Sequence, residues 1–115
     1  MSLSPLEYLR HMRDEAEYLM TQTETVGEEE FFANETLKRA FVRSLEIIGE
    51  AAKQVSETIR QRHPQVEWRA MGDMRNRLIH DYFGVDYEIV WDVVVNKIPL
   101  LSQKLEEILH QESQS

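Results

Sequence analysis

The apolar residues near the start of the chain recur every three to four positions, which is the spacing of one face of an α-helix. Ser4 and Pro5 stand just before them, and a capping serine followed by proline is typical of a helix start. We therefore predict a helix from about Pro5 to about Thr23. The glutamates at 28–30 interrupt the pattern, so we expect them in a solvated loop or in the first turn of the next element. The apolar positions are Leu6, Leu9, Met12, Ala16 and Leu19.

The longest helical pattern begins at Asn34, a residue type that caps helices well. His63 and Pro64 end it, because proline cannot continue the hydrogen-bond ladder and pushes the preceding residue out of the α region. We predict one continuous helix over residues 34–63. Its apolar positions alternate by fours and threes: Phe41, Leu45, Ile48, Ala52, Val55 and Ile59.

Two further helices are predicted in the second half of the chain. The first runs from Glu67 to about His80, and Gly84 suits its exit. The second is capped by Asp86, and Pro99 should kink it or divide it in two. Their apolar positions are Trp68, Met71, Met74, Leu78 and Ile79 in the first, and Val90, Val94, Ile98, Leu101, Leu105 and Ile108 in the second.

These elements together predict the fold class. Amphipathic helices with short connections and no alternating strand pattern are typical of an all-α, up-and-down bundle of four to five helices. A length of 115 residues suits a single helical domain over residues 1–115. The long stripe of residues 34–63 is compatible with a homodimer, although the core of an ordinary bundle explains the same spacing.

Composition narrows the classes of site and location. The chain has no cysteine, which excludes disulfides, thiolate metal sites and a cysteine nucleophile. No export signal is visible, and no stretch approaches the roughly 18 to 20 apolar residues that span a bilayer, so we expect a cytoplasmic protein without a membrane partner. His11, His63 and His110 lack carboxylates at ligand spacing, so neither a metal nor another cofactor is predicted.

Charge is distributed unevenly along the chain. The net charge of −8 argues against a nucleic-acid partner, because phosphate binding depends largely on Lys and Arg. Residues 60–80, however, sum to +3, so one short basic zone lies in an acidic protein. Arg60, Arg62 and His63 are explained by the C-terminal end of a helix, where cations are favoured. Arg75 and Arg77 are less easily explained in that way.

Residues 75–82 hold the side chains best suited to catalysis. Cleavage of RNA without a metal needs a base for the 2′-hydroxyl, an acid for the leaving 5′-oxygen and a cation for the charge that builds on phosphorus. The imidazole of His80 exchanges protons near neutrality, and the guanidinium of Arg75 is permanently charged. These two residues are therefore the candidate catalytic residues of a metal-independent endoribonuclease.

Two neighbouring residues are candidate supporting residues. Asn76 either orients the imidazole of His80 or caps the end of the helix. Arg77 either binds RNA phosphate or pairs with Asp73 four residues earlier. We prefer the salt bridge for Arg77, because this spacing is a common arrangement on helix surfaces.

Helical geometry separates the two candidate catalytic residues. In a straight helix the side chains of Arg75 and His80 diverge by about 140°. Asn76 and Arg77 share a face with His80, whereas Arg75 shares one with Tyr82. Either the helix distorts before Tyr82, or a second subunit completes the site. We favour the second subunit, because a two-fold axis would supply two histidines, one for each proton transfer.

The motif resembles that of a known family. Arg75, His80 and Tyr82 match the Arg-x4-His-x-Tyr signature of the HepT-like ribonuclease toxins, a branch of the HEPN superfamily. The resemblance covers roughly residues 5–110. Its further segments are Ile48-Gly49-Glu50-Ala51-Ala52, His63-Pro64, Trp68, Val90-Trp91 and Pro99-Leu100-Leu101.

The resemblance implies an all-α homodimer with the motif in a cleft at the dimer interface. It also implies an endoribonuclease, with tRNA as one class of target, that acts as the toxin of a type II or nucleotidyltransferase-regulated toxin–antitoxin pair. In that family a minimal nucleotidyltransferase antitoxin can transfer AMP to the motif tyrosine, which is Tyr82 here. The alternative is a non-catalytic helical partner that binds substrate for a nucleotidyltransferase, and charge and fold class alone would suggest a purely structural homodimer.

Overall fold

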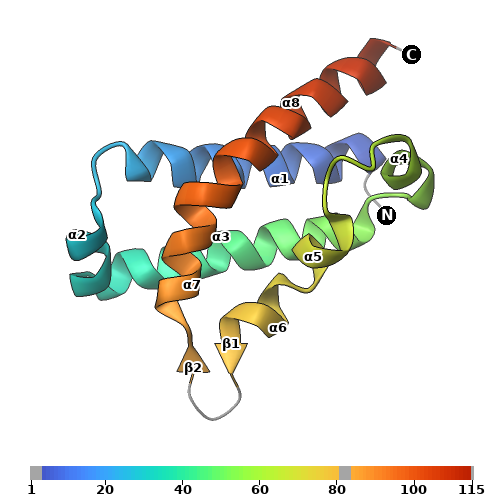
Figure 1. The fold of residues 1–115 in the computed structure, drawn as a ribbon. Helices are drawn as coiled ribbons and strands as arrows, with labels where there is room; N and C mark the ends of the chain where they lie inside the picture. Colours follow the sequence, from blue (N-terminus) through green and yellow to red (C-terminus); the bar gives the residue numbers. More distant parts are fainter. Residues whose placement is uncertain (1–3, 81–83, 115) are drawn as a thin grey trace.

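A computed structural model describes residues 4–80 and 84–114, without the side chains of Pro5 and His80 (Figure 1). Most of this part of the chain is helical, and the prediction of an all-α protein is confirmed. The helices are α1 (Pro5–Thr23), α2 (Glu28–Ala33), α3 (Glu35–Gln54), α4 (Glu57–Arg62), α5 (Trp68–Gly72), α6 (Met74–Leu78), α7 (Tyr87–Asp92), the π-helical η1 (Val93–Lys97) and α8 (Ile98–Gln114). Two short strands, β1 (Ile79–His80) and β2 (Gly84–Val85), pair with each other.

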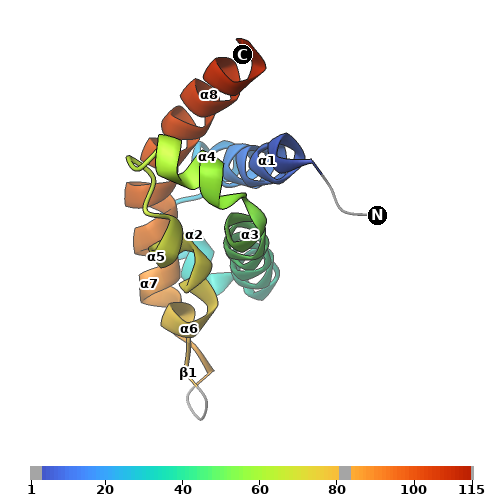
Figure 2. The same cartoon turned by 90° about the vertical axis from the view of Figure 1, so that its right-hand side faces the viewer.

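Three long helical segments form the body of the protein. Figure 1 shows α1 and α3 side by side in opposite directions, with the segment from α7 to α8 crossing them. The helix α1 packs against both α3 and α8. Figure 2 shows the short helices α4, α5 and α6 following one another along one side of α3. The core between these segments includes Leu9, Met12, Leu19, Phe41, Leu45, Ile48, Leu105 and Ile108, all of which are fully buried.

The first helix has the predicted bounds. Oγ of Ser4 accepts a hydrogen bond from the backbone N–H of Glu7 at 3.4 Å, and Pro5 occupies the first turn. The glutamates 28–30 form the first turn of α2, which is the second of the two alternatives considered for them. Negative charge is favourable there, because the N-terminal end of a helix carries a partial positive charge.

The long helix predicted over residues 34–63 is divided, and the prediction of one continuous helix is wrong. The helix α3 ends at Gln54, and Val55 turns to an extended conformation with ψ 134°. Ser56 then caps α4, its Oγ accepting from the N–H of Ile59 at 3.3 Å. A serine can satisfy the free N–H groups of a new helix, so the break leaves few donors unpaired. Val55 and Ile59 are both buried, which is why the apolar period continues across the break.

The helix predicted from Glu67 to His80 is also shorter than expected. Asp73 (φ −89°, ψ 8°) separates α5 from α6, and Ile79 is extended (φ −112°, ψ 120°). Ile79 pairs with Val85, and His80 pairs with Gly84 in antiparallel register. Gly84 has a φ of +75°, a conformation that a residue without a Cβ adopts easily. The hairpin supplies these partners from a later segment, which the local helical pattern could not reveal.

The helix α5 lies unusually close to α3. A Cβ added to Gly49 of α3 would stand 2.7 Å from the backbone oxygen of Met71 in α5. Only a residue without a side chain allows this approach of the two backbones. Gly49 therefore allows the short distance between α5 and α3, and it thereby affects the position of α6, which follows α5.

The C-terminal segment keeps its helical course through Pro99. Asp86 caps α7 as predicted, with its Oδ1 accepting from the N–H of Ile89 at 3.2 Å. Pro99 has no N–H to donate to the carbonyl of Val95, and η1 occupies the turn before it with π-type bonding. The expected irregularity is thus a π-helical segment that joins α7 to α8.

Candidate active site

The candidate motif begins on a very short helix held by two buried side chains. Met74 and Leu78 of α6 are fully buried, and they anchor the helix between α3 and α7. Arg75, Asn76 and Arg77 lie between them and are exposed. The apolar spacing of four residues therefore turns the predicted polar residues toward solvent, where a substrate can reach them.

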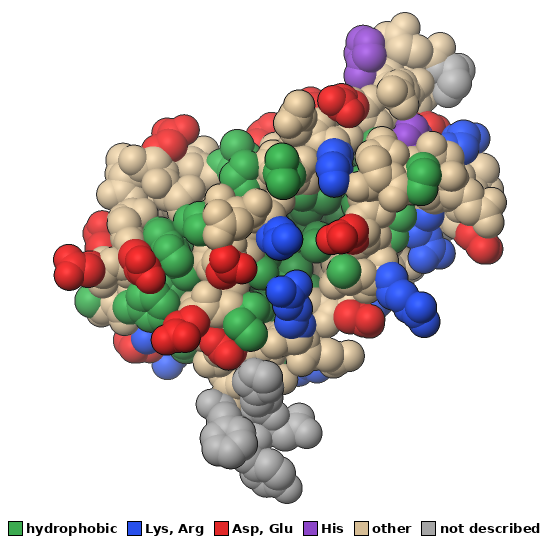
Figure 3. All heavy atoms as spheres, viewed as in Figure 1, with side chains coloured by type: hydrophobic (Ala, Val, Ile, Leu, Met, Phe, Trp, Pro, Cys, Tyr) green, Lys and Arg blue, Asp and Glu red, His purple; other side chains and the backbone are tan. Residues whose placement is uncertain are grey.

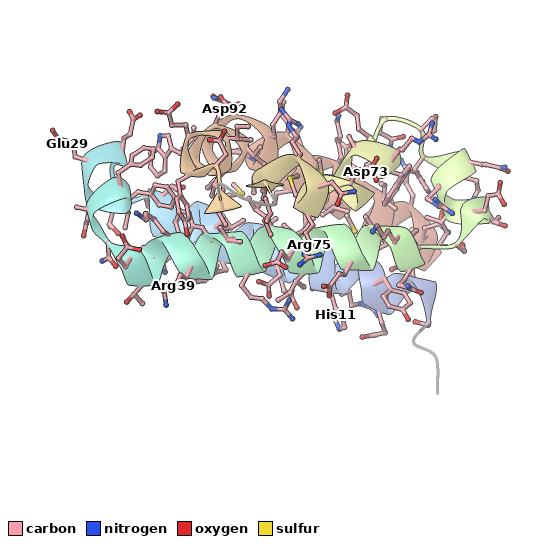
Figure 4. All side chains as sticks on the ribbon, turned by 90° about the horizontal axis from the view of Figure 1, so that it is seen from below. His11, Glu29, Arg39, Asp73, Arg75 and Asp92 are labelled. Carbon is pink, nitrogen blue, oxygen red and sulfur yellow. The ribbon has the colours of Figure 1, made fainter. Side chains whose placement is uncertain are left out.

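Arg75 lies where α6 passes over α3 (Figure 4). Its Nε stands 3.6 Å from Oε2 of Glu46, and its side chain is 70% exposed. Exposed ion pairs of this kind contribute little to stability, because water competes for both charges. The guanidinium thus keeps most of its donors available for an anion such as phosphate.

The preferred interpretation of Arg77 is wrong. Arg77 forms no ion pair with Asp73 or with any other residue in ranges 4–80 and 84–114; only its backbone N–H bonds to the carbonyl of Asp73, at 3.2 Å. The side chain of Asn76 likewise has no hydrogen bond to a described residue, and the residue that ends α6 is Ile79. Both supporting residues present their polar groups to solvent, where they can bind a ligand.

His80 does not continue the helix of Arg75. Because α6 ends at Leu78 and His80 belongs to β1, the angle of 140° expected for a straight helix does not apply. The first of the two alternatives, a distortion of the helix before Tyr82, describes the backbone. The imidazole of His80 and all of Tyr82 lie outside the described residues, so the pairing of Arg75 with His80 stays a prediction.

The structure also joins three polar residues that the sequence analysis did not connect. Nε2 of His63 lies 2.7 Å from Oε2 of Glu112, and Arg62 donates to the same carboxylate from Nε at 3.2 Å. His63 is buried, and its backbone carbonyl accepts from the indole N–H of Trp68 at 2.9 Å. The hydrogen bond with His63 is the main cause that holds the pKa of Glu112 below its ordinary value; burial opposes it and Arg62 adds to it.

This His63 cluster is a structural connection rather than a reaction centre. It ties the end of α4 to the last turns of α8, and the imidazole has almost no surface for a substrate. His63 and Glu112 are 49 residues apart, so no local spacing could have indicated the pair. The sequence showed only that a polar residue, His63, precedes Pro64; that it is buried is known from the structure.

The described residues offer neither a metal-binding cluster nor a membrane-spanning helix. No three His, Asp or Glu side chains in this part of the chain gather closely enough to hold a metal ion. None of its helices is long and apolar enough to cross a membrane.

Comparison with known proteins agrees with the family resemblance. A family described as "Ribonuclease HepT-like" matches residues 7–108. The chain is 43% identical over 109 residues to "Putative RNase TTE0752" of Caldanaerobacter subterraneus subsp. tengcongensis, covering 95% of this chain and 97% of the relative. It is 37% identical over 108 residues to "Probable ribonuclease HepT" of Thermococcus cleftensis, covering 94% and 98%. No solved structure matches the chain significantly.

Proposed function

This chain belongs to the HepT-like ribonuclease family, and we propose that it cleaves RNA without a metal ion at a site formed by Arg75 and His80. The observation that carries the proposal is the placement of Arg75. It stands exposed on α6 with a single weak ion pair, and the backbone leads from it directly into the strand of His80. An exposed guanidinium and a histidine five residues further along the chain supply the minimal groups for phosphodiester cleavage.

The reaction follows from these two groups. The imidazole of His80 takes the proton of the 2′-hydroxyl, and the 2′-oxygen attacks the adjacent phosphorus. The bond from phosphorus to the 5′-oxygen breaks, and that oxygen takes a proton from a second imidazole. The products are a 2′,3′-cyclic phosphate and a 5′-hydroxyl. Arg75 stabilises the negative charge on phosphorus, while Asn76 and Arg77 bind neighbouring polar groups of the substrate.

A homodimer would supply the second imidazole. Each chain has one motif histidine, and an isologous interface would bring His80 of two copies to one cleft. One copy would act as base and the other as acid in the same turnover. This arrangement supports full acid–base catalysis in a chain of this size.

The regulation that we propose rests on Tyr82. In a cytoplasmic toxin–antitoxin pair, a minimal nucleotidyltransferase would transfer AMP from ATP to the phenol oxygen of Tyr82 and release pyrophosphate. The added phosphate and nucleoside would occupy the space that RNA needs, and their negative charge would repel it. tRNA is the substrate class to test first.

The central test is cleavage of RNA by the purified chain in the presence of a chelator. His80→Ala should abolish the formation of cyclic phosphate ends, whereas His11→Ala, which removes an exposed histidine of α1, should leave it unchanged (Figure 4). Circular dichroism checks that both variants keep the helical fold. Equal cleavage by His80→Ala and the native chain would contradict the site.

One observation favours the alternative, a non-catalytic partner of a nucleotidyltransferase. The net charge of −8 weakens binding to a polyanion such as RNA. The native chain would then cleave no RNA, would bind such an enzyme tightly, and would not be modified on Tyr82. Size-exclusion chromatography and intact-mass measurement of the mixture distinguish this outcome.

A further inference from the structure

Two neighbouring grooves, together called the double groove, lie beside the motif. In the first, of about 270 Å³, α5 and the segment before it face η1 and α8; the second, of about 590 Å³, is bordered by residues of α4, α5 and the segment between them. The two halves share Val66 and Glu67 in their walls. Lys97 and Lys104 line the first half, and Arg60 and Arg69 line the second. The double groove is thus bordered by four cations drawn from four elements of the fold.

The four cations of the double groove form no ion pair with a described residue, and Nζ of Lys104 donates to the backbone oxygen of Gln65 at 2.8 Å. All Lys and Arg residues lie within the described ranges, and the ion pairs found there take up Arg10, Arg13, Lys38, Arg43, Arg62 and Arg75. None of the four groove cations is among them. Nε of Arg60 is buried without a hydrogen-bond partner. An acidic protein that keeps these four cations without carboxylate partners in two neighbouring grooves has a local site for anions.

The charge of this face is divided between its two ends. Figure 3 shows Lys and Arg side chains over η1, α8 and the side where α4 and α5 lie, whereas acidic side chains gather over α2 and α7. Inside the double groove only Glu67 and Asp73 are acidic. A polyanion approaching this face is therefore directed to the double groove and away from α2 and α7.

The double groove is continuous with the motif along the chain. Asp73, which lines its second half, is the residue that precedes α6, and Arg75 and Arg77 follow within that helix. The first half also has an apolar side, where Leu100 is 56% exposed. Single-stranded RNA is bound by surfaces of this kind, in which cations contact the phosphates and a neighbouring apolar surface contacts the faces of the bases.

We infer that the double groove binds the single-stranded RNA that flanks the cleavage position. This inference rests on the proposed ribonuclease function. Lys97, Lys104, Arg60 and Arg69 bind successive phosphates, and Leu100 contacts a base. Binding outside the motif compensates for the acidic remainder of the chain and sets which RNAs are held long enough to be cut.

The test compares two variants with the same change of charge. Lys97→Gln/Lys104→Gln removes two groove cations, and Arg10→Gln/Arg39→Gln removes two from α1 and α3. Each carries His80→Ala as well, so that RNA stays intact while its affinity is measured by fluorescence anisotropy with a labelled single-stranded oligonucleotide. The groove variant should bind about tenfold more weakly at 0.1 M salt, and its salt slope should fall by about 1.4, while the control keeps both values.

A third variant tests the opposite direction. Glu67→Gln removes the carboxylate shared by both halves of the double groove, and this side chain makes no capping hydrogen bond for α5. RNA should bind about threefold more tightly, because one repulsive charge leaves the phosphate path. Unchanged affinity in both the Glu67 variant and the groove variant would overturn the inference.

The remaining outcomes separate this inference from the proposed function. Equal weakening in the groove variant and the control would mean that only net charge matters, and the inference would fail. If the groove variant loses binding to poly-glutamate but not to RNA, the double groove binds an acidic protein segment instead. Cleavage is measured separately with native His80: its absence would contradict the proposed function, while the anisotropy comparison would still decide whether RNA occupies the double groove.

Discussion

In the cluster that joins α4 to α8, His63 and the carboxylate of Glu112 are largely covered while Arg62 reaches them from the surface, whereas Arg75 and Glu46 meet where α6 crosses α3. Both sites pair an arginine with a glutamate. In the first, the carboxylate is only 11% exposed and accepts from two side chains, one at 2.7 Å. In the second, one contact of 3.6 Å is all that holds the arginine.

This difference separates a structural use of charge from a functional one. His63 and Arg62 both direct hydrogen bonds to Glu112, so the cluster fixes the position of the C-terminal helix, and its imidazole has almost no surface for a ligand. The surface pair at Arg75 stabilises little, yet it leaves a guanidinium oriented and accessible beside β1. Residue type alone therefore does not distinguish the two arginines, whereas the number of hydrogen bonds to the partner carboxylate does.

The largest expected effect is the loss of RNA cleavage when Arg75, but not Arg62, is replaced by alanine. Arg75→Ala should lower RNA cleavage by about 10²- to 10³-fold, because it removes the cation at the phosphate. Its free energy of unfolding should change by less than about 1 kcal/mol, since the lost ion pair is exposed. Arg62→Ala should do the reverse, with cleavage unchanged and a small loss of stability. Loss of activity in both variants without a difference in stability would remove the distinction between the sites.

Gly49→Ala tests whether the packing under the motif matters. The new Cβ would meet the backbone oxygen of Met71 at 2.7 Å, so α5 must move away from α3 at a cost of about 1–3 kcal/mol. Urea denaturation should show this loss, and cleavage should fall because α6 moves with α5. Gly27→Ala is the control, as a Cβ there meets nothing within 4 Å, and it should change stability by about 1 kcal/mol or less.

Glu112→Gln weakens the buried cluster. Because hydrogen bonds to a charged acceptor are lost, the free energy of unfolding at neutral pH should fall by about 1–2 kcal/mol. Glu107→Gln, a change to an exposed residue of the same helix, is the control and should have little effect.

The difference in stability between the native chain and Glu112→Gln should also depend on pH, in a direction set by the pKa of Glu112. The pKa of Glu112 is held below its ordinary value of 4.5 in the folded protein, so its carboxylate stabilises the fold above that pH. The contribution is lost as the pH falls through the folded-state pKa. The stability difference between the native chain and Glu112→Gln should therefore be full at neutral pH and shrink below pH 4.5. A difference that stays constant down to low pH would contradict the role of this carboxylate.

Glu46→Gln should have the smallest effect. It removes the half-buried partner of the exposed Arg75, so stability should change by less than about 1 kcal/mol. RNA affinity should rise slightly at low salt, because a negative charge beside Arg75 is gone, and the gain should fade as salt screens it. Glu50→Gln, which removes the partner of Arg43, has the same change of net charge and should not raise the affinity.

Much of the helical content was predictable from the periodicity of apolar residues. The bounds of α1 follow from Ser4 and Pro5 at one end and from the end of the apolar pattern at the other, and the cap at Asp86 was recognised in the same way. These signals are local, because capping and amphipathicity act within one or two turns. The motif residues Arg75, His80 and Tyr82 were likewise identified from their spacing in the sequence.

Contacts between distant segments were not predictable. Helical propensity could not show that residues 34–63 break at Val55, or that α6 ends at Leu78 so that Ile79 can pair with Val85. The pairing of Ile79 depends on a partner from a later segment, and tertiary contacts override local preference when they satisfy more groups. The break at Val55 does have a local sign, the capping residue Ser56, but the apolar period continues across it.

The sequence alone thus determines the motif and the helical pattern, because each depends on residues within a few positions of one another. The His63 cluster, the close approach at Gly49 and the double groove exist only once α3, α5 and α8 have packed together. The physical reason is that hydrogen-bond partners, burial and electrostatic surroundings are properties of positions in space. Arg62 and Arg75 are the same residue type in one short stretch of sequence, and packing alone gives one of them a close contact with Glu112 and the other only a longer contact with Glu46.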